Sequence, residues 1–166
     1  MFVGSLGVLK SMTALESGEL FSLELGGKKA FCLKLHADES GRMYIAVLNT
    51  PGVEELEPFF FKKFPDGYVN SFGKGWVVEL IENEDSYVSS EFALREAFGV
   101  IIKDQDHVGL RISSSKGSGR PGFLDLPSGS FVPMDHHSVI YTEWKIWAND
   151  AHQSTEGAVP LYHRVP

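Results

Sequence analysis

One stretch of the sequence, LFSLELGGKKAFCLKL, constrains the fold more than any other. In its first half, Leu20–Leu25, apolar residues recur at every second position and therefore share one face. A period of two residues is typical of a β-strand that is buried on one side. Gly26 and Gly27 follow, and two glycines favour a tight hairpin turn because glycine enters positive φ without strain. The alternation then resumes in KAFCLKL, so the stretch predicts a β-hairpin.

Further short apolar runs are separated by turn signals, and we expect strands at 43–49, 58–64, 76–81, 100–103, 107–113 and 139–147. The first of these would complete a three-stranded meander with the hairpin. One helix is expected at Ser90–Phe98, because Glu91 lies in its first turn, Arg95 follows at i+4 and Gly99 ends it. We predict a single, mainly β (or α+β) domain spanning residues 1–166. Its architecture would be a small barrel or a strongly bent antiparallel sheet, with one short helix near residues 90–98.

Cysteine content and hydropathy bear on the compartment. Cys32 is the only cysteine, so no disulfide can form within the chain, and a reducing, cytoplasmic environment is expected. The N-terminal apolar run is short and is followed, not preceded, by Lys10, which is unlike a signal peptide. No apolar run approaches the ~20 residues that span a bilayer, so we predict no membrane association.

Negative charge is concentrated in the middle of the chain. Between Gly52 and Asp106, twelve acidic residues outnumber five basic ones, and this segment accounts for the whole net charge of −7. Such a field repels phosphate backbones and attracts basic surfaces, so it argues against nucleic acid and favours a basic protein partner. The alternative is a solvated acidic face that only aids solubility. The predicted partner-binding residues are Glu79, Glu82, Glu84, Asp85, Tyr87 and Tyr68.

The segment SSSKGSGRPG contains a G-x-G-x-x-G spacing, which is typical of dinucleotide-binding loops. In those proteins a helix follows the glycines and its amides hold the phosphates. Here FLDLPSGSF follows, without a helical pattern, and Pro121 removes one amide. We therefore predict a mobile surface loop, or alternatively a clamp for an anion or partner, formed by Lys116, Gly117, Gly119 and Arg120.

A metal site is an alternative hypothesis for the segment FVPMDHHSVIYTEWKIW. On one continuous strand, Asp135, His137 and Glu143 would share a face, and His163 would join them from a C-terminal strand. The stretch resembles the metal motif of the cupins, which implies a divalent metal and a barrel-strand enzyme. It departs from that motif because its two histidines are adjacent instead of alternating. Structural, hydrogen-bonded histidines are the competing interpretation.

Cys32 and the aromatic residues each allow a structural and a functional interpretation. Cys32 lies on the opposite face from Phe31 and Leu33, and we expect a buried, unreactive thiol. If it were exposed, the neighbouring Lys34 would lower its pKa. The aromatic residues, Trp76 among them, are numerous enough to line a ligand pocket, but a β core uses such residues too.

The hairpin GELFSLELGGKKAFCLKL (Gly18–Leu35) and the later strand GKGWVVELIE (Gly73–Glu82) together resemble the small β-barrel immunity proteins of bacterial polymorphic toxin systems. Glu19 stands where that family prefers Asp. The resemblance implies a cytoplasmic, non-catalytic protein that neutralises a toxin by covering it. We therefore expect a non-catalytic binding or protein-interaction module without a cofactor. The alternatives are the metal-dependent or acid-base enzyme and a small-ligand carrier with an aromatic pocket.

Overall fold

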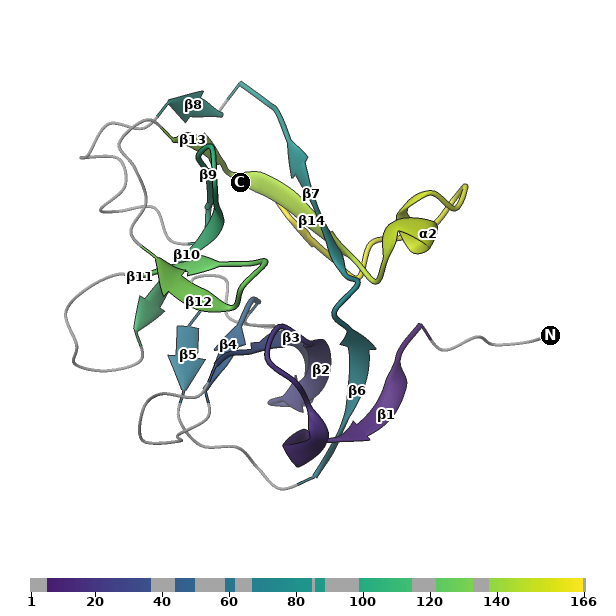
Figure 1. Ribbon diagram of the computed structural model, residues 1–166. Helices are drawn as coiled ribbons and strands as arrows, with labels where there is room; N and C mark the ends of the chain where they lie inside the picture. Colours follow the sequence, from purple (N-terminus) through teal and green to yellow (C-terminus); the bar gives the residue numbers. More distant parts are fainter. Residues whose placement is uncertain are drawn as a thin grey trace.

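The computed structural model describes residues 6–36, 44–49, 59–61, 67–84, 86–88, 99–114, 122–132 and 138–165. β-Strands dominate these residues, and nearly all neighbouring strands are antiparallel (Figure 1). The predicted mainly β fold with antiparallel strands is therefore confirmed. None of the helices in this part of the chain is long and apolar enough to cross a membrane.

The first group of strands contains the predicted hairpin. Its hydrogen-bonded order is β1 (Val8–Ser11), β6 (Tyr68–Gly73), β2 (Leu20–Leu25), β3 (Lys28–Lys34), β4 (Ile45–Val47) and β5 (Phe59–Phe61). β2, β3 and β4 form the expected meander. Gly26 and Gly27 have φ values of 59° and 78°, which is the positive-φ pair that a type I′ hairpin turn requires.

A second group continues from β5 through a parallel pairing with β10 (Val108–Ser114). It comprises β9 (Ile101–Lys103), β13 (Val139–Tyr141), β8 (Tyr87–Val88), β11 (Gly122–Asp125) and β12 (Ser130–Val132). The main path of described strands runs from β1 at one end to β8 at the other. Because these two end strands do not pair, the described strands form an open sheet and no closed barrel.

A separate three-stranded sheet has the order β15 (Tyr162–Arg164), β14 (Glu143–Trp147) and β7 (Val77–Ile81). A short helix, α2 (Asp150–Gln153), follows β14, and the Asn149 side chain caps it by accepting a hydrogen bond from the His152 amide at 2.8 Å. A 3₁₀ turn, η1 (Met12–Ala14), follows β1. The helix predicted near residues 90–98 lies outside the described residues.

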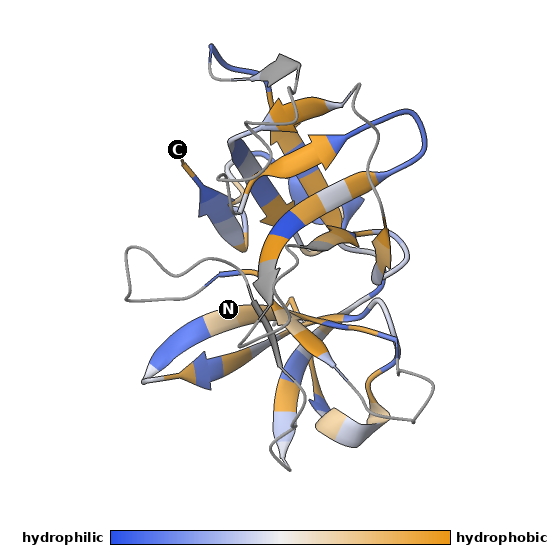
Figure 2. Ribbon diagram, turned by 90° about the vertical axis from the view of Figure 1, so that its left-hand side faces the viewer, coloured by the Kyte–Doolittle hydropathy of each residue, from blue (hydrophilic) through white to orange (hydrophobic). Residues whose placement is uncertain are grey.

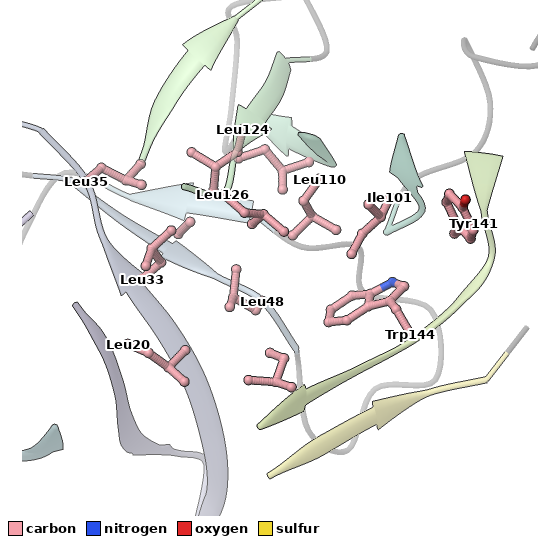
Figure 3. Packing of buried hydrophobic residues seen from close by; sticks show 13 residues of the cluster. Leu20, Leu33, Leu35, Leu48, Ile101, Leu110, Leu124, Leu126, Tyr141 and Trp144 are labelled. Atoms are coloured by element: carbon pink, nitrogen blue, oxygen red, sulfur yellow. The ribbon is translucent and has the colours of Figure 1, made fainter. Parts of the chain in front are cut away.

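The main hydrophobic cluster draws side chains from all three groups of strands. Figure 3 shows Leu33 and Leu48 of the first group facing Leu110 of the second, with the Trp144 ring of β14 beside them. The Trp144 side chain is only 1% exposed, and its Nε1 donates to the carbonyl of Gly99 at 2.9 Å. The three groups therefore share one core (Figure 2 shows apolar residues along the strands of each).

A second cluster packs on the other face of the first group of strands. Phe21, Cys32 and Val47 belong to it, together with Met12 of η1. Leu20 and Leu33, their neighbours in sequence, face the main cluster. The alternation in β2 and β3 therefore does not separate a core face from a solvent face, since both faces are buried at the centre of the sheet.

The strand expected at residues 139–147 is not continuous, and the prediction that its alternate residues share one face is wrong. The chain pairs with β9 through β13, then turns at Thr142 and pairs with β7 through β14. Ile140 consequently lies in a third cluster with Val100 and Ile102, whereas Trp144 lies in the main cluster. Passing from one sheet to another changes which side chains face the core.

Candidate functional site

An open cleft of about 730 Å³ is the candidate site. Its described walls come from five separate stretches: the loop before β2, the residues after β3, the β6–β7 connection with the start of β7, the start of β10, and the β11–β12 turn. The residues that line it are Ser17, Gly18, His36, Lys74, Trp76, Val77, Val78, Val108, Leu126, Pro127 and Ser128.

Hydrogen bonds fix the wall that precedes β2. The Gly18 amide donates to the carbonyl of Lys34 at 2.8 Å, and the Ser17 hydroxyl donates to the carbonyl of Leu35 at 3.1 Å. From the β6–β7 connection, the indole Nε1 of Trp76 donates to the carbonyl of Gly18 at 3.0 Å. The ring that lines the cleft is therefore tied to the backbone of the opposite wall.

The β11–β12 turn forms another wall and is equally constrained. The Leu126 amide donates to the carbonyl of Val108 at 2.9 Å. The carboxylate of Asp125, a buried residue, accepts from the Ser128 amide at 3.0 Å, and Gly129 completes the turn with a φ of 66°. Backbone and turn geometry therefore hold both of these walls in place.

Two basic side chains, those of His36 and Lys74, lie at the cleft. His36 is exposed, and the Lys74 ammonium forms an ion pair with the carboxylate of Glu16 at 2.7 Å. The hydrogen bond and charge of Lys74 lower the pKa of the Glu16 carboxyl. Both side chains of this pair are more than half exposed, so the pair contributes little to stability and leaves Lys74 available to other anions.

A buried charge cluster supports the wall that contains Gly18. Glu19 is largely buried, accepts from Lys10 at 2.7 Å and also accepts from the Glu16 amide at 2.6 Å. Lys34 is buried beside it and donates to the carbonyl of Leu15 at 3.3 Å. Burial lowers the pKa of Lys34, although the charge of Glu19 opposes that effect. Glu19, at the position that differs from the immunity-type pattern, is therefore a structural carboxylate.

A second polar region covers the outer face of the three-stranded sheet. On this face Glu79 accepts from Trp147 Nε1 at 2.7 Å and from Lys145 at 3.4 Å. Burial disfavours the charged form of Glu79, but these hydrogen bonds outweigh it, and its pKa lies below the ordinary value of 4.5. Trp147 also packs edge-on against His152 of α2. Glu79 is thus an internally paired carboxylate.

The predicted partner-binding residues do not form one patch among the described residues. Glu82 and Glu84 are exposed beyond the end of β7, whereas Tyr68, 74% exposed, begins β6. β6 and β7 follow one another along the molecule, which separates these positions (Figure 1). Asp85 and the side chain of Tyr87 lie outside what the structure describes.

Two of the four predicted metal ligands come together. Glu143 on β14 and His163 on β15 are joined by a contact of 2.8 Å between Oε1 and Nε2, and Asn83 donates to the other carboxylate oxygen at 3.2 Å. The hydrogen bond from His163 is the largest cause that lowers the pKa of Glu143. Asp135 and His137 lie outside the described residues, and the described part of the chain contains no group of three metal-ligating side chains.

The glycine-rich loop lies largely outside the described residues, including Lys116, Gly117, Gly119 and Arg120. The segment after it is described. From Gly122 the chain forms β11, a turn and β12, so no helix follows the glycines. This strand-turn-strand structure lacks the helical amides that a dinucleotide-binding loop needs.

Part of this site is predictable from the sequence. Trp76 was among the predicted pocket aromatics and does line the cleft. His36, Lys74 and Ser128 were missed, because each is an ordinary loop residue whose position depends on contacts between distant segments. Cys32 is buried as expected, and burial raises the pKa of its thiol.

Comparisons of the chain with protein families, with curated proteins and with solved structures found no match.

Proposed function

We propose that the protein is a non-catalytic binding module and that the cleft between its sheets holds a small ligand with an apolar body. The observation that carries this proposal is the cleft itself, whose walls include the Trp76 ring and the aliphatic side chains of Val78, Val108 and Leu126. Its volume of about 730 Å³ falls within the range of roughly 300–1,000 Å³ that is usual for small-molecule sites.

The composition of the walls also supports binding. Small-molecule sites are mostly apolar with a few polar groups that orient the ligand. Here Ser17, Ser128, Lys74 and His36 supply such groups around the apolar surface. The hydrogen bonds of Trp76 and of the β11–β12 turn hold the walls in place, which lowers the entropic cost of binding.

The test uses Nile red, a neutral dye whose fluorescence rises in apolar surroundings. We expect the wild-type protein to enhance its fluorescence and 1-octanol to displace it. Ser128→Phe places a ring at the exposed rim of the cleft and should abolish the enhancement. Ser154→Phe adds the same ring at an exposed position after α2 and is the matched control. Equal enhancement by both variants, or none by the wild type, would contradict the proposal.

We propose a second function, recognition of a basic protein, because Glu82 and Glu84 are exposed at one end of the molecule. This proposal agrees with the resemblance to immunity proteins and with the acidic middle of the chain. A partner recovered from native lysate at low salt should be lost at high salt and with Glu82→Gln/Glu84→Gln. It should be retained by Glu24→Gln/Glu156→Gln, which removes two other exposed carboxylates. If recovery of the partner depends neither on salt nor on Glu82→Gln/Glu84→Gln, this surface does not bind it.

A further inference from the structure

The charges around the cleft indicate the chemistry of its ligand. Among the described lining residues, Lys74 and His36 are the ones with ionisable side chains, and both are cationic when charged. Behind the Gly18 wall, Lys10 and Lys34 lie with Glu16 and Glu19. Together with Lys74, the three lysines are balanced by these two glutamates and by the buried carboxylate of Asp125 in the β11–β12 turn. The described lining itself nevertheless carries Lys74 and His36 and no acidic side chain, in a chain whose net charge is −7.

Lys74 already binds a carboxylate in this structure. The Glu16 carboxylate contacts it at 2.7 Å from outside the set of lining residues. Because both side chains of the pair are more than half exposed to water, its net contribution to stability is small. A ligand that carries its own carboxylate into the cleft can take the place of Glu16 on Lys74 at little cost.

An apolar surface lies beside this cation. Trp76, Val78 and Val108 are partly buried and pack against the main core, while Leu126 belongs to that core. Their cleft-facing surface offers contact to a hydrocarbon or aromatic body but no partner for a second charge. The apolar surface and the cation at its rim thus match a molecule with one acidic end.

We propose that the cleft binds a small amphipathic carboxylate, whose acidic group replaces that of Glu16 on Lys74 while its apolar body lies against Trp76. This inference depends on the proposed small-ligand function and specifies the class of ligand. It also gives Glu16 a role as an internal competitor, since its carboxylate occupies Lys74 when no ligand is bound.

The test compares octanoate with 1-octanol by titration calorimetry, because the two differ in the charged group and share the same chain length. In the wild-type protein one exposed ion pair replaces another, so its affinities for octanoate and octanol should differ by less than about twofold, whereas Glu16→Gln should prefer octanoate about two- to fivefold, the effect of a half-exposed ion pair. Adding Lys74→Met to Glu16→Gln should remove that preference, which comes from a higher affinity for octanoate and not from a lower one for octanol. Adding Lys28→Met instead, which removes an exposed lysine at the β2–β3 hairpin, should leave the preference unchanged.

The outcomes separate the two proposals. If neither compound binds, the small-ligand function fails and this inference fails with it. If both bind equally to Glu16→Gln, or if the preference persists when Lys74→Met is added, the cleft remains a ligand site but the carboxylate assignment is wrong. A gain in octanoate affinity with Glu16→Gln, in a protein that retains its wild-type unfolding temperature, supports the exchange of carboxylates.

Discussion

Strands β3 and β14 show two ways of using the same alternating pattern. β3 is buried on both faces: Leu33 lies in the main cluster and Cys32 in the second one. β14 is buried on one face through Trp144, whereas its other face is only partly covered: Trp147 is buried beside α2, but Lys145 reaches the polar outer surface. Alternation alone therefore does not tell how many faces of a strand are covered. What decides it is whether another layer packs on the second face.

The largest expected effect concerns the second face of β3. Because Cys32 is fully buried and burial raises its thiol pKa, a thiol reagent should reach it only after the protein opens. For a typical domain stability of about 5 kcal/mol or more, labelling should be slower by roughly 10³-fold or more than in denaturing urea. The rate of colour release from a disulfide reagent measures this. Labelling at the unfolded rate would show that the second cluster does not protect this face.

Neighbouring substitutions on β14 compare its two faces directly. Trp144→Ala removes a buried ring and its hydrogen bond to Gly99, and should lower the free energy of unfolding by about 3–5 kcal/mol. Lys145→Ala removes a partly exposed ion pair with Glu79 and should cost only about 0–1 kcal/mol. Urea denaturation of both variants gives the two values. Similar losses would mean that the outer face is as tightly packed as the inner one.

The smallest expected effect is the pH dependence of the stability that Glu79 contributes on the outer face of the three-stranded sheet. The pKa of Glu79 is lower in the folded protein than its ordinary value of 4.5. The contribution of its carboxylate to the free energy of unfolding is therefore complete above pH 4.5. It is lost as the pH falls through the folded pKa, where the carboxylate becomes protonated. Glu79→Gln should therefore lose less stability than the wild type when the pH is lowered from neutrality to below 4.5. Urea midpoints across this range test the prediction, and identical acid sensitivity of the two proteins would contradict it.

The fold could be predicted wherever the signal was local. The β2–β3 hairpin follows from alternation and from a glycine pair, and both features lie within one short stretch. β6 was missed because its sequence, YVNSFG, contains residues of low strand propensity, and it forms through pairing with β1 and β2. The break at Thr142 was missed because it depends on which sheet each half of the segment joins.

The candidate site was harder to predict for the same reason. Trp76 has a recognisable aromatic signature, but Lys74 and His36 gain their significance only because β3 and the β6–β7 connection end beside one cleft. Glu79 and Glu143 show what an acidic residue in the sequence leaves open. Their acidic character suggested sites for a partner and a metal, whereas in the folded chain they bond to Trp147 and His163. Charge patterns in sequence do not distinguish a free carboxylate from one that the fold has already satisfied.

The composition of the main cluster has a consequence for synthesis on the ribosome. Leu20 and Leu33 emerge early, but Trp144 and Ile146, which pack in the same cluster, are translated more than a hundred residues later. The first hairpins can pair locally, yet one apolar side of them stays only partly covered until those late residues arrive. We expect the nascent chain to need protection by a chaperone during that interval.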